Sequence, residues 1–152
     1  MDCLIRNAVM EDYKAVLEMM NQVQQMHVSW RSDIYKPNTH MISVDTFSKF
    51  IEEDTLYVAE ANGKVIGIMK IEYHHIETPV HITKNMIYID TMAVDEKYRG
   101  HGVGHKFFET VKVIKMEKGF DGIELQVNAK NKSAYEMYLK CGFTEKSVNM
   151  EL

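Results

Sequence analysis

The stretch Arg99-Gly100-His101-Gly102-Val103-Gly104 separates an apolar, strand-like segment from an amphipathic, helix-like segment. Its three glycines, at alternate positions, remove the Cβ atoms that would keep an anion away from the backbone. They also permit the φ > 0 conformations that turn successive N–H groups inward. The helix that follows adds the positive end of its dipole. This spacing predicts a cradle for a pyrophosphate group.

Two other phosphate-binding loops do not match these residues. A nucleoside-triphosphate loop requires Gly-Lys followed by Ser or Thr, whereas Gly104 is followed by His105 and Lys106. A dinucleotide fingerprint requires another glycine where the chain has His105. By itself the stretch is equally compatible with an ordinary strand-to-helix turn, so the residues around it must decide.

Those residues resemble the GNAT superfamily of acyl-CoA-dependent N-acetyltransferases in two motifs. Arg99, Gly102 and Gly104 fall on the fixed positions of the family's Arg/Gln-x-x-Gly-x-Gly/Ala loop, and residues 88–94 resemble its cofactor strand. A weaker similarity near Ile5-Arg6 extends the resemblance over nearly the whole chain. The second motif, Asn…Ala…Tyr…Gly-Phe, is matched by Asn131, Ala134, Tyr138, Gly142 and Phe143.

The resemblance implies one acetyltransferase domain over residues 1–152, with an α/β fold. Its sheet would be mixed and mostly antiparallel, with helices on both faces, and splayed at the cofactor strand. The implied enzyme moves an acetyl group from acetyl-CoA directly to a primary amine of a small molecule or peptide. A catalytically silent acyl-CoA-binding sensor or partner-binding module would keep the same cradle and is the alternative.

The same resemblance implies which residues contact the cofactor. They are backbone N–H groups of the strand and loop, together with polar side chains of the second motif. Asn131 is equally well explained as the N-cap of a helix that begins near Lys132. The predicted contacts are Met92, Ala93, Val94, Arg99, Gly100, His101, Gly102, Val103, Gly104, Asn128, Asn131, Ser133 and Tyr138.

Tyr138 is the predicted general acid. A phenol with a reference pKa of about 10 stays protonated at neutral pH and can still protonate a departing thiolate. A core tyrosine on an amphipathic helix is the alternative, and the position of Tyr138 in the second motif favours the catalytic role.

Asp90 is the first candidate for the base that accepts the proton of the amine, because a carboxylate here interrupts an otherwise apolar strand. Backbone or hydroxyl donors could equally satisfy this carboxylate. Glu72, on the preceding strand, is the second candidate base. Strict alternation along the strand would place Asp90 on the face of Tyr88 and Met92, opposite Ile87, Ile89 and Thr91.

Composition bounds the remaining classes. A chain of 152 residues with 45% hydrophobic and 26% charged residues fits one globular domain, and a net charge of −4 argues against a nucleic-acid partner. Two cysteines make no disulfide framework, and three histidines, His74, His75 and His81, lack the accompanying ligands of a metal site. We expect no metal, no membrane segment and a cytoplasmic protein. The amine acceptor, the use of other acyl groups and the oligomeric state, a homodimer included, stay open.

Hydrophobic periodicity and turn residues predict the order of elements. Asn62-Gly63 predicts a tight hairpin, Ser43 a helix N-cap and Gly119 a helix end. The histidine-containing segment after residue 71 is predicted to be a strand end and a loop. The predicted strands lie near residues 4–6, 56–61, 64–71, 86–94, 122–127 and 143–151, and the helices near 10–27, 43–53, 102–118 and 132–140.

Overall fold

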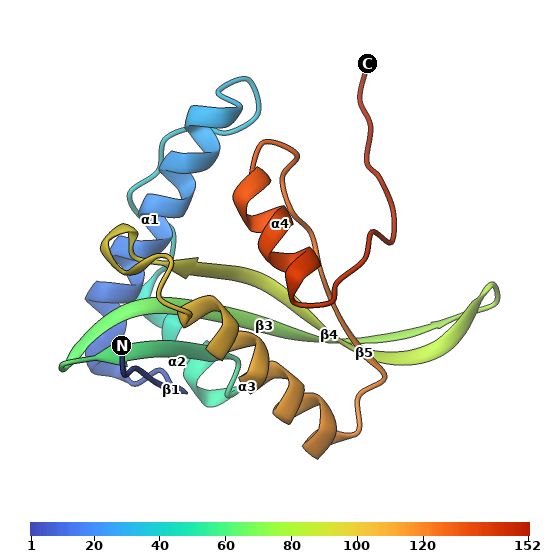
Figure 1. Ribbon diagram of the computed structural model, residues 1–152, viewed down its shortest axis with the longest axis horizontal. Coiled ribbons are helices and arrows are strands. Elements are labelled where there is room, and N and C mark those ends of the chain that lie inside the picture. The colour runs from blue at the N-terminus through green and yellow to red at the C-terminus, as the bar shows by residue number, and fades with distance from the viewer.

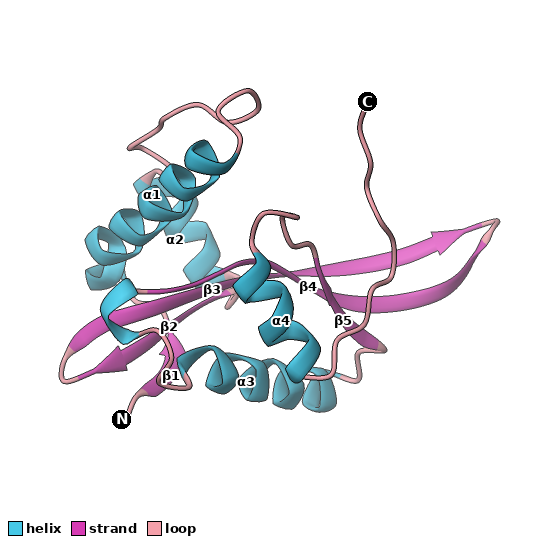
Figure 2. Ribbon diagram, turned by 45° about the horizontal axis from the view of Figure 1, so that its top comes forward, coloured by secondary structure: helices cyan, strands magenta, loops and turns pink.

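A computed structural model describes residues 1–152 as a sheet between two layers of helices (Figures 1 and 2). The strands lie side by side in the order in which they occur along the chain. The first four run antiparallel, and the last is parallel to its neighbour, which confirms the predicted mixed sheet. The strands are β1 (Leu4–Asn7), β2 (Leu56–Ala61), β3 (Lys64–Thr78), β4 (His81–Val94) and β5 (Gly122–Leu125).

Helices cover both faces of the sheet, as predicted. On one face lie α1 (Tyr13–Trp30) and α2 (Val44–Glu52), and on the other lie α3 (Val103–Lys118) and α4 (Lys132–Lys140) (Figure 2). Two short 3-10 turns, η1 (Met10–Asp12) and η2 (Glu96–Tyr98), precede α1 and the glycine loop. No helix is both long and apolar enough to cross a membrane.

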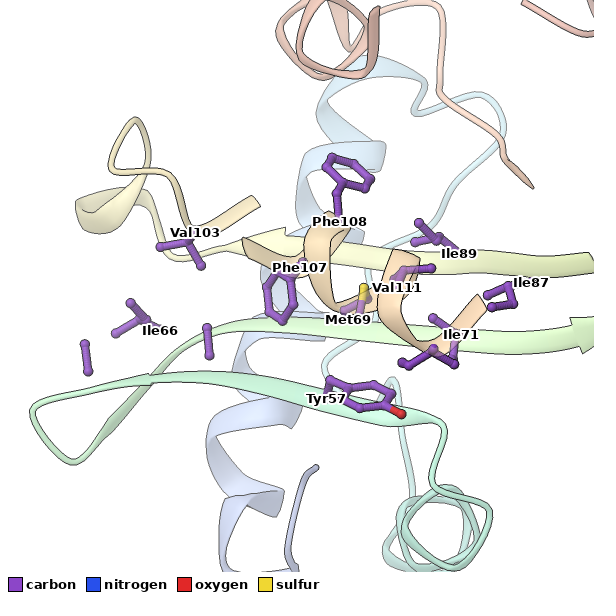
Figure 3. Close-up of a cluster of buried hydrophobic side chains, with 13 residues drawn as sticks. Tyr57, Ile66, Met69, Ile71, Ile87, Ile89, Val103, Phe107, Phe108 and Val111 are labelled. Carbon is purple, nitrogen blue, oxygen red and sulfur yellow. The ribbon is translucent and has the colours of Figure 1, made fainter. Parts of the chain in front are cut away.

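Each face of the sheet has its own apolar core. The larger core joins α3 to the sheet, where Phe107 and Val111 pack with Met69 and Ile71 (Figure 3). The smaller core, which includes Phe47, joins α1 and α2 to the opposite face. The central strands are therefore anchored from both sides, and β4 can carry functional groups on a rigid support.

Local sequence signals form the turns and caps that they predict. Ser43 Oγ accepts the Thr46 N–H at 3.2 Å, which caps α2. Asn62 and Gly63 have φ values of 50° and 74°, the positive pair that a tight hairpin requires. Gly119 ends α3 in the left-handed conformation, with φ of 70°.

The segment after residue 71 corrects the sequence prediction. It forms no loop there, because β3 and β4 continue as a two-stranded arm that projects beyond the rest of the sheet (Figure 1). Side chains along the arm bond to one another: His75 lies 2.7 Å from Asn85 and 2.9 Å from Glu77. Pairing across the arm supplies the backbone hydrogen bonds that the short apolar pattern did not reveal.

The strand predicted for residues 143–151 is also wrong. Phe143 N–H bonds to the Tyr138 carbonyl, and no residue beyond it makes a backbone hydrogen bond. The segment runs past α4 (Figure 1) and bonds to β5 only through a side chain, where Lys146 Nζ donates to Glu124 Oε2 at 2.6 Å, so no strand pairs with it. Val148 and Met150, which carry the alternating apolar pattern, remain 71% and 88% exposed.

Arg6 ties β1 to its neighbours through two carboxylates. Its guanidinium donates to Asp12 at 2.7 and 3.0 Å and to Glu60 at 2.7 Å. Burial alone would raise the pKa of Asp12, but the hydrogen bonds from Arg6 and from the Val9 N–H outweigh it and hold that pKa below 3.8. The carboxylate therefore stabilises the fold in its charged form.

Asp12→Asn should lower the free energy of unfolding at pH 7 by about 2 kcal/mol, because the half-buried Arg6 guanidinium loses the more buried of its two carboxylate partners. Asp12 has a lowered pKa in the folded state, so its contribution is complete above the unfolded pKa of about 3.9 and disappears as the pH falls through the folded value. Urea unfolding at pH 7 and pH 3 should show the difference between the two chains shrinking with acid. The exposed Asp33→Asn is the control, and an equal loss there would contradict this role for Asp12.

Candidate active site

The glycine loop has the backbone conformation that the sequence predicts for a cradle. Gly100 and Gly102 have φ values of 77° and 83°, a region that strains any residue with a Cβ. Gly102 precedes the first turn of α3, and its carbonyl accepts the Lys106 N–H at 3.1 Å. The N–H groups of the turn between them have no acceptor within the helix, so they are available to an anion.

Two side chains hold this loop by hydrogen bonds to backbone carbonyl groups. Arg99 Nε donates to the Val94 carbonyl at 3.0 Å, and His101 Nδ1 donates to the Arg99 carbonyl at 2.9 Å. Gly104 is buried, and a Cβ there would lie 3.1 Å from Met137 Sδ of α4. The absence of a side chain at Gly104 thus lets α4 approach α3, which brings the two sequence motifs together.

The sheet opens beside the loop, at the end of β4. Pairing with β5 stops at Ile89, and the remaining residues of β4 have no strand on that side. Asp95 N–H bonds to Ile66 of β3 at 2.8 Å, so alternation directs Ala93 toward β3 and turns Met92 and Val94 outward. The open edge thus carries two N–H groups close to the glycine loop. Of the three amides predicted to contact a cofactor, that of Ala93 faces the other way.

A β-bulge at Asp90 reverses the alternation of β4. Ile89 pairs with Ile71 and Thr91 with Lys70, which leaves Asp90 as an extra residue. Met92 consequently packs on the α3 side, in the core that contains Ile89, and Thr91 shares the opposite face with Asp90. The predicted faces of Met92 and Thr91 were therefore wrong, since a strict period of two does not allow for an inserted residue.

Asp90 and Thr91 form part of the wall of a cavity of about 370 Å³ between the sheet, α1 and α2. Its volume falls in the range of small-molecule sites, about 300–1,000 Å³. The cavity is lined by Met20, Val23, Gln24, His27, Met41, Ile42, Thr46, Phe50, Lys70, Asp90 and Thr91.

The two candidate bases have different surroundings. Asp90 is exposed, and its carboxylate accepts only the neighbouring Thr91 hydroxyl, at 3.2 Å. Glu72 lies outside the 370 Å³ cavity and bonds to His74 Nε2 at 2.8 Å, while the His74 ring stacks on Tyr88. Asp90 therefore has an exposed carboxylate at the cavity that is bonded only to its neighbour Thr91, whereas Glu72 is bonded to a histidine.

Tyr138 projects from α4 into an aromatic cluster on the other face. The centroid of its ring lies 5.7 Å from that of Phe108, in an edge-on contact, and 5.9 Å from that of Phe143. Burial, with a smaller effect of Cys141, raises the pKa of the phenol above 10.0, which keeps it protonated. The Tyr138 hydroxyl has no hydrogen-bond partner within the protein, and it is not fully buried. The only side-chain polar atom that is both buried and without a partner is the hydroxyl of Tyr73.

The polar residues of the second motif organise the start of α4. Asn131 Oδ1 accepts the Ala134 N–H at 3.3 Å, which confirms the predicted N-cap. Asn128 Oδ1 accepts the Lys130 N–H at 2.9 Å in the preceding turn. Ser133 is exposed and lies 3.5 Å from Asn131 Oδ1. The amide nitrogens of both asparagines stay free of protein partners.

A glycine loop with positive φ, an open strand edge beside it and the second motif on the adjoining helix are thus assembled in one molecule. A sequence model of the Acetyltransferase (GNAT) family matches residues 20–143. The chain belongs to this family.

Two curated relatives of the GNAT chain carry acetyltransferase names. An uncharacterized N-acetyltransferase of Methanocaldococcus jannaschii is 33% identical over 98 residues, which make up 64% of this chain and 42% of the relative. A streptothricin acetyltransferase of Escherichia coli is 32% identical over 93 residues, 61% of this chain and 49% of the relative. The chain spans less than half the length of each.

Solved structures share the GNAT fold over nearly the full chain. A tetramutant of the BH1408 protein of Bacillus halodurans has a TM-score of 0.90 at 27% identity, covering 98% of both chains. The aminoglycoside N-acetyltransferase AAC(6')-Iy, crystallised with CoA, has a TM-score of 0.77 at 15% identity, covering 99% of this chain and 93% of its own. At that identity the likeness shows the fold alone.

The sequence did not lead us to Lys70, which forms part of the wall of the 370 Å³ cavity and is only 5% exposed. Its ammonium donates to the Ile71 carbonyl at 2.6 Å and lies 4.3 Å from the centre of the Phe50 ring. A signal was present, because Lys70 interrupts the apolar run of β3 just as Asp90 interrupts that of β4.

Proposed function

We propose that the chain transfers an acetyl group from acetyl-CoA directly to a primary amine of a small molecule or peptide. The observation that carries this proposal is the open edge of β4, with the outward amides of Met92 and Val94 beside the left-handed glycine loop. The loop amides would bind the diphosphate of the donor, and the strand amides would hold its pantetheine arm and polarise the thioester carbonyl. Family membership supports the same chemistry.

Each proton transfer then has a candidate residue. The amine nitrogen attacks the thioester carbonyl carbon, a C–N bond forms and the C–S bond breaks. Asp90, free of partners other than Thr91, accepts the proton lost by the amine, directly or through water. Tyr138, whose pKa is raised by burial, gives its hydroxyl proton to the departing thiolate. Neither cysteine is needed as a nucleophile in these reaction steps.

Asp90→Asn should lower kcat/KM for the amine about 10- to 100-fold, because the amide cannot accept the proton. The loss should be greatest at low pH, where the amine is most fully protonated. The matched control is Glu72→Gln, which removes the other strand carboxylate and should change kcat/KM less than Asp90→Asn. The reverse order would make Glu72 the base and remove Asp90 from this role.

Incubating the chain with acetyl-CoA and a panel of amines, while following release of free thiol, tests the function itself. Mass spectrometry of the mixture should find a product heavier by one acetyl group. If CoA binds but no amine releases thiol, the chain is a silent acyl-CoA-binding module. If CoA does not bind at all, the proposal fails at its first step.

A further inference from the structure

The cavity beside Asp90 carries little net charge. Its titratable side chains are Asp90, Lys70 and His27. Asp90 and Lys70 have opposite charges, and burial lowers the pKa of His27, which favours its neutral form. Burial lowers the pKa of Lys70, and the nearby charges of Glu72, Asp90 and Glu53 only partly offset that effect. Asp90 is the only carboxylate in the wall of this cavity, so a cationic ligand finds a single carboxylate there.

Lys70 is not neutralised by direct contact. No carboxylate lies within 4.0 Å of its ammonium, whose only hydrogen bond goes to the Ile71 carbonyl. Because Lys70 is 5% exposed and lines the cavity, water can screen its charge only weakly. A second cationic group of a bound ligand would meet this ammonium without a carboxylate of its own.

Part of the cavity wall suits a hydrocarbon, because five of its eleven residues are hydrophobic, while Gln24, Thr46 and Thr91 add polar groups. Met20 and Val23 of α1 face it from one side, and Met41 and Phe50 from the loop and helix that follow. Methionine side chains are flexible and polarisable, so they adapt to apolar groups of different shape. Burial of an apolar ligand against them is favourable, whereas burial of an unpaired charge is strongly unfavourable.

We propose that the acceptor is a small monoamine whose amino group lies at Asp90 and whose hydrocarbon or aromatic body contacts Met20, Val23 and Met41, and that Lys70 excludes acceptors with a second cationic group. This inference rests on the proposed acetyl transfer and specifies its substrate class. Aminoglycosides and polyamines carry several cationic groups, so this chain would discriminate against them. The ammonium of Lys70 also favours the neutral form of a nearby amine, which is the form that attacks.

Three amines of equal chain length separate charge from shape: hexylamine, aminohexanol and hexamethylenediamine. For the unmodified chain, kcat/KM for hexylamine should exceed that for the diamine by about tenfold or more, because the diamine brings a second ammonium into a cavity that holds Lys70 and has no second carboxylate. Aminohexanol, which is polar but uncharged at the same end, should fall between them. A diamine that equals or exceeds hexylamine would overturn the proposal without any variant.

Lys70→Met keeps the length of the side chain and removes its charge. The preference for hexylamine over the diamine should then shrink by about fivefold or more, while aminohexanol keeps its place relative to hexylamine. Lys84→Met, which removes an exposed charge from the arm, is the matched control and should leave the preference unchanged. An unchanged preference in Lys70→Met would remove Lys70 from specificity.

Two other negative results can be distinguished from a failure of the proposed role of Lys70. If no amine releases thiol from acetyl-CoA, the proposed function fails rather than the substrate class. If Lys70→Met does not fold, Lys70→Gln takes its place, and the comparison of the three amines with the unmodified chain remains decisive.

Discussion

A chain with Tyr138→Phe should turn over its acceptor about 10- to 100-fold more slowly, or slower still, with its affinity for coenzyme A largely kept. The substitution removes one hydroxyl from a ring that packs against both Phe108 and Phe143, so the helix and its apolar contacts should persist. The lost hydroxyl would otherwise protonate the thiolate. Steady-state rates of thiol release and calorimetric CoA binding, measured on the same preparation, test both parts.

The pH dependence and a neighbouring tyrosine make this test specific. A general acid works in its protonated form, so its contribution should be constant through neutral pH and fall only as pH rises through the raised pKa of Tyr138, above 10.0. Tyr135→Phe is the control, because that hydroxyl lies on the same helix and bonds to Glu145 at 2.8 Å. Unchanged turnover in Tyr138→Phe, or an equal loss in Tyr135→Phe, would exclude Tyr138 as the acid.

Gly102→Asp should weaken binding of coenzyme A about 100-fold. The position has φ of 83°, so any side chain there is strained, and a carboxylate at this point would repel the diphosphate in the loop. Repulsion between like charges a few ångströms apart is worth about 2–4 kcal/mol near a protein surface, which is the size of the expected effect. Calorimetry with coenzyme A at low ionic strength measures it directly.

The far end of the same helix provides a matched control. Gly119 also has a positive φ, of 70°, and open space around its Cα, so Gly119→Asp introduces the same strain and the same charge. That chain should lose comparable stability and still bind coenzyme A within about threefold, since the charge is remote from the loop. Equal weakening by both substitutions would place the diphosphate elsewhere.

Much of this fold is encoded in short stretches of sequence, and those parts were predictable. Ser43, Asn62-Gly63 and Gly119 act through the backbone of their immediate neighbours, so their effect is legible without the rest of the molecule. The glycine loop belongs to the same class. Gly100 and Gly102 permit its positive φ values, and both residues adopt them in the structure.

Features that depend on distant partners were not predictable. The alternating pattern of residues 143–151 is typical of a strand, but a strand needs a neighbour whose backbone pairs with it, and no backbone hydrogen bond reaches this segment beyond Phe143. The long arm shows the converse, because β3 and β4 continue where their apolar pattern fades by bonding to each other. In the site, Asp90 could be proposed from the sequence because its charge interrupts an apolar strand. Its position beside Lys70 and Thr91 depends on the register shift between β3 and β4, which the sequence does not reveal.

The extra residue at Asp90 has a consequence for comparing this protein with its relatives. A homologue that lacks this extra residue would keep its counterparts of Thr91 and Met92 on the same faces as here, but each would come one position earlier along its strand. An alignment that ignores the insertion would then assign specificity to side chains on the wrong surface. Substrate preferences should therefore be transferred between such proteins only after the length of this one strand has been matched.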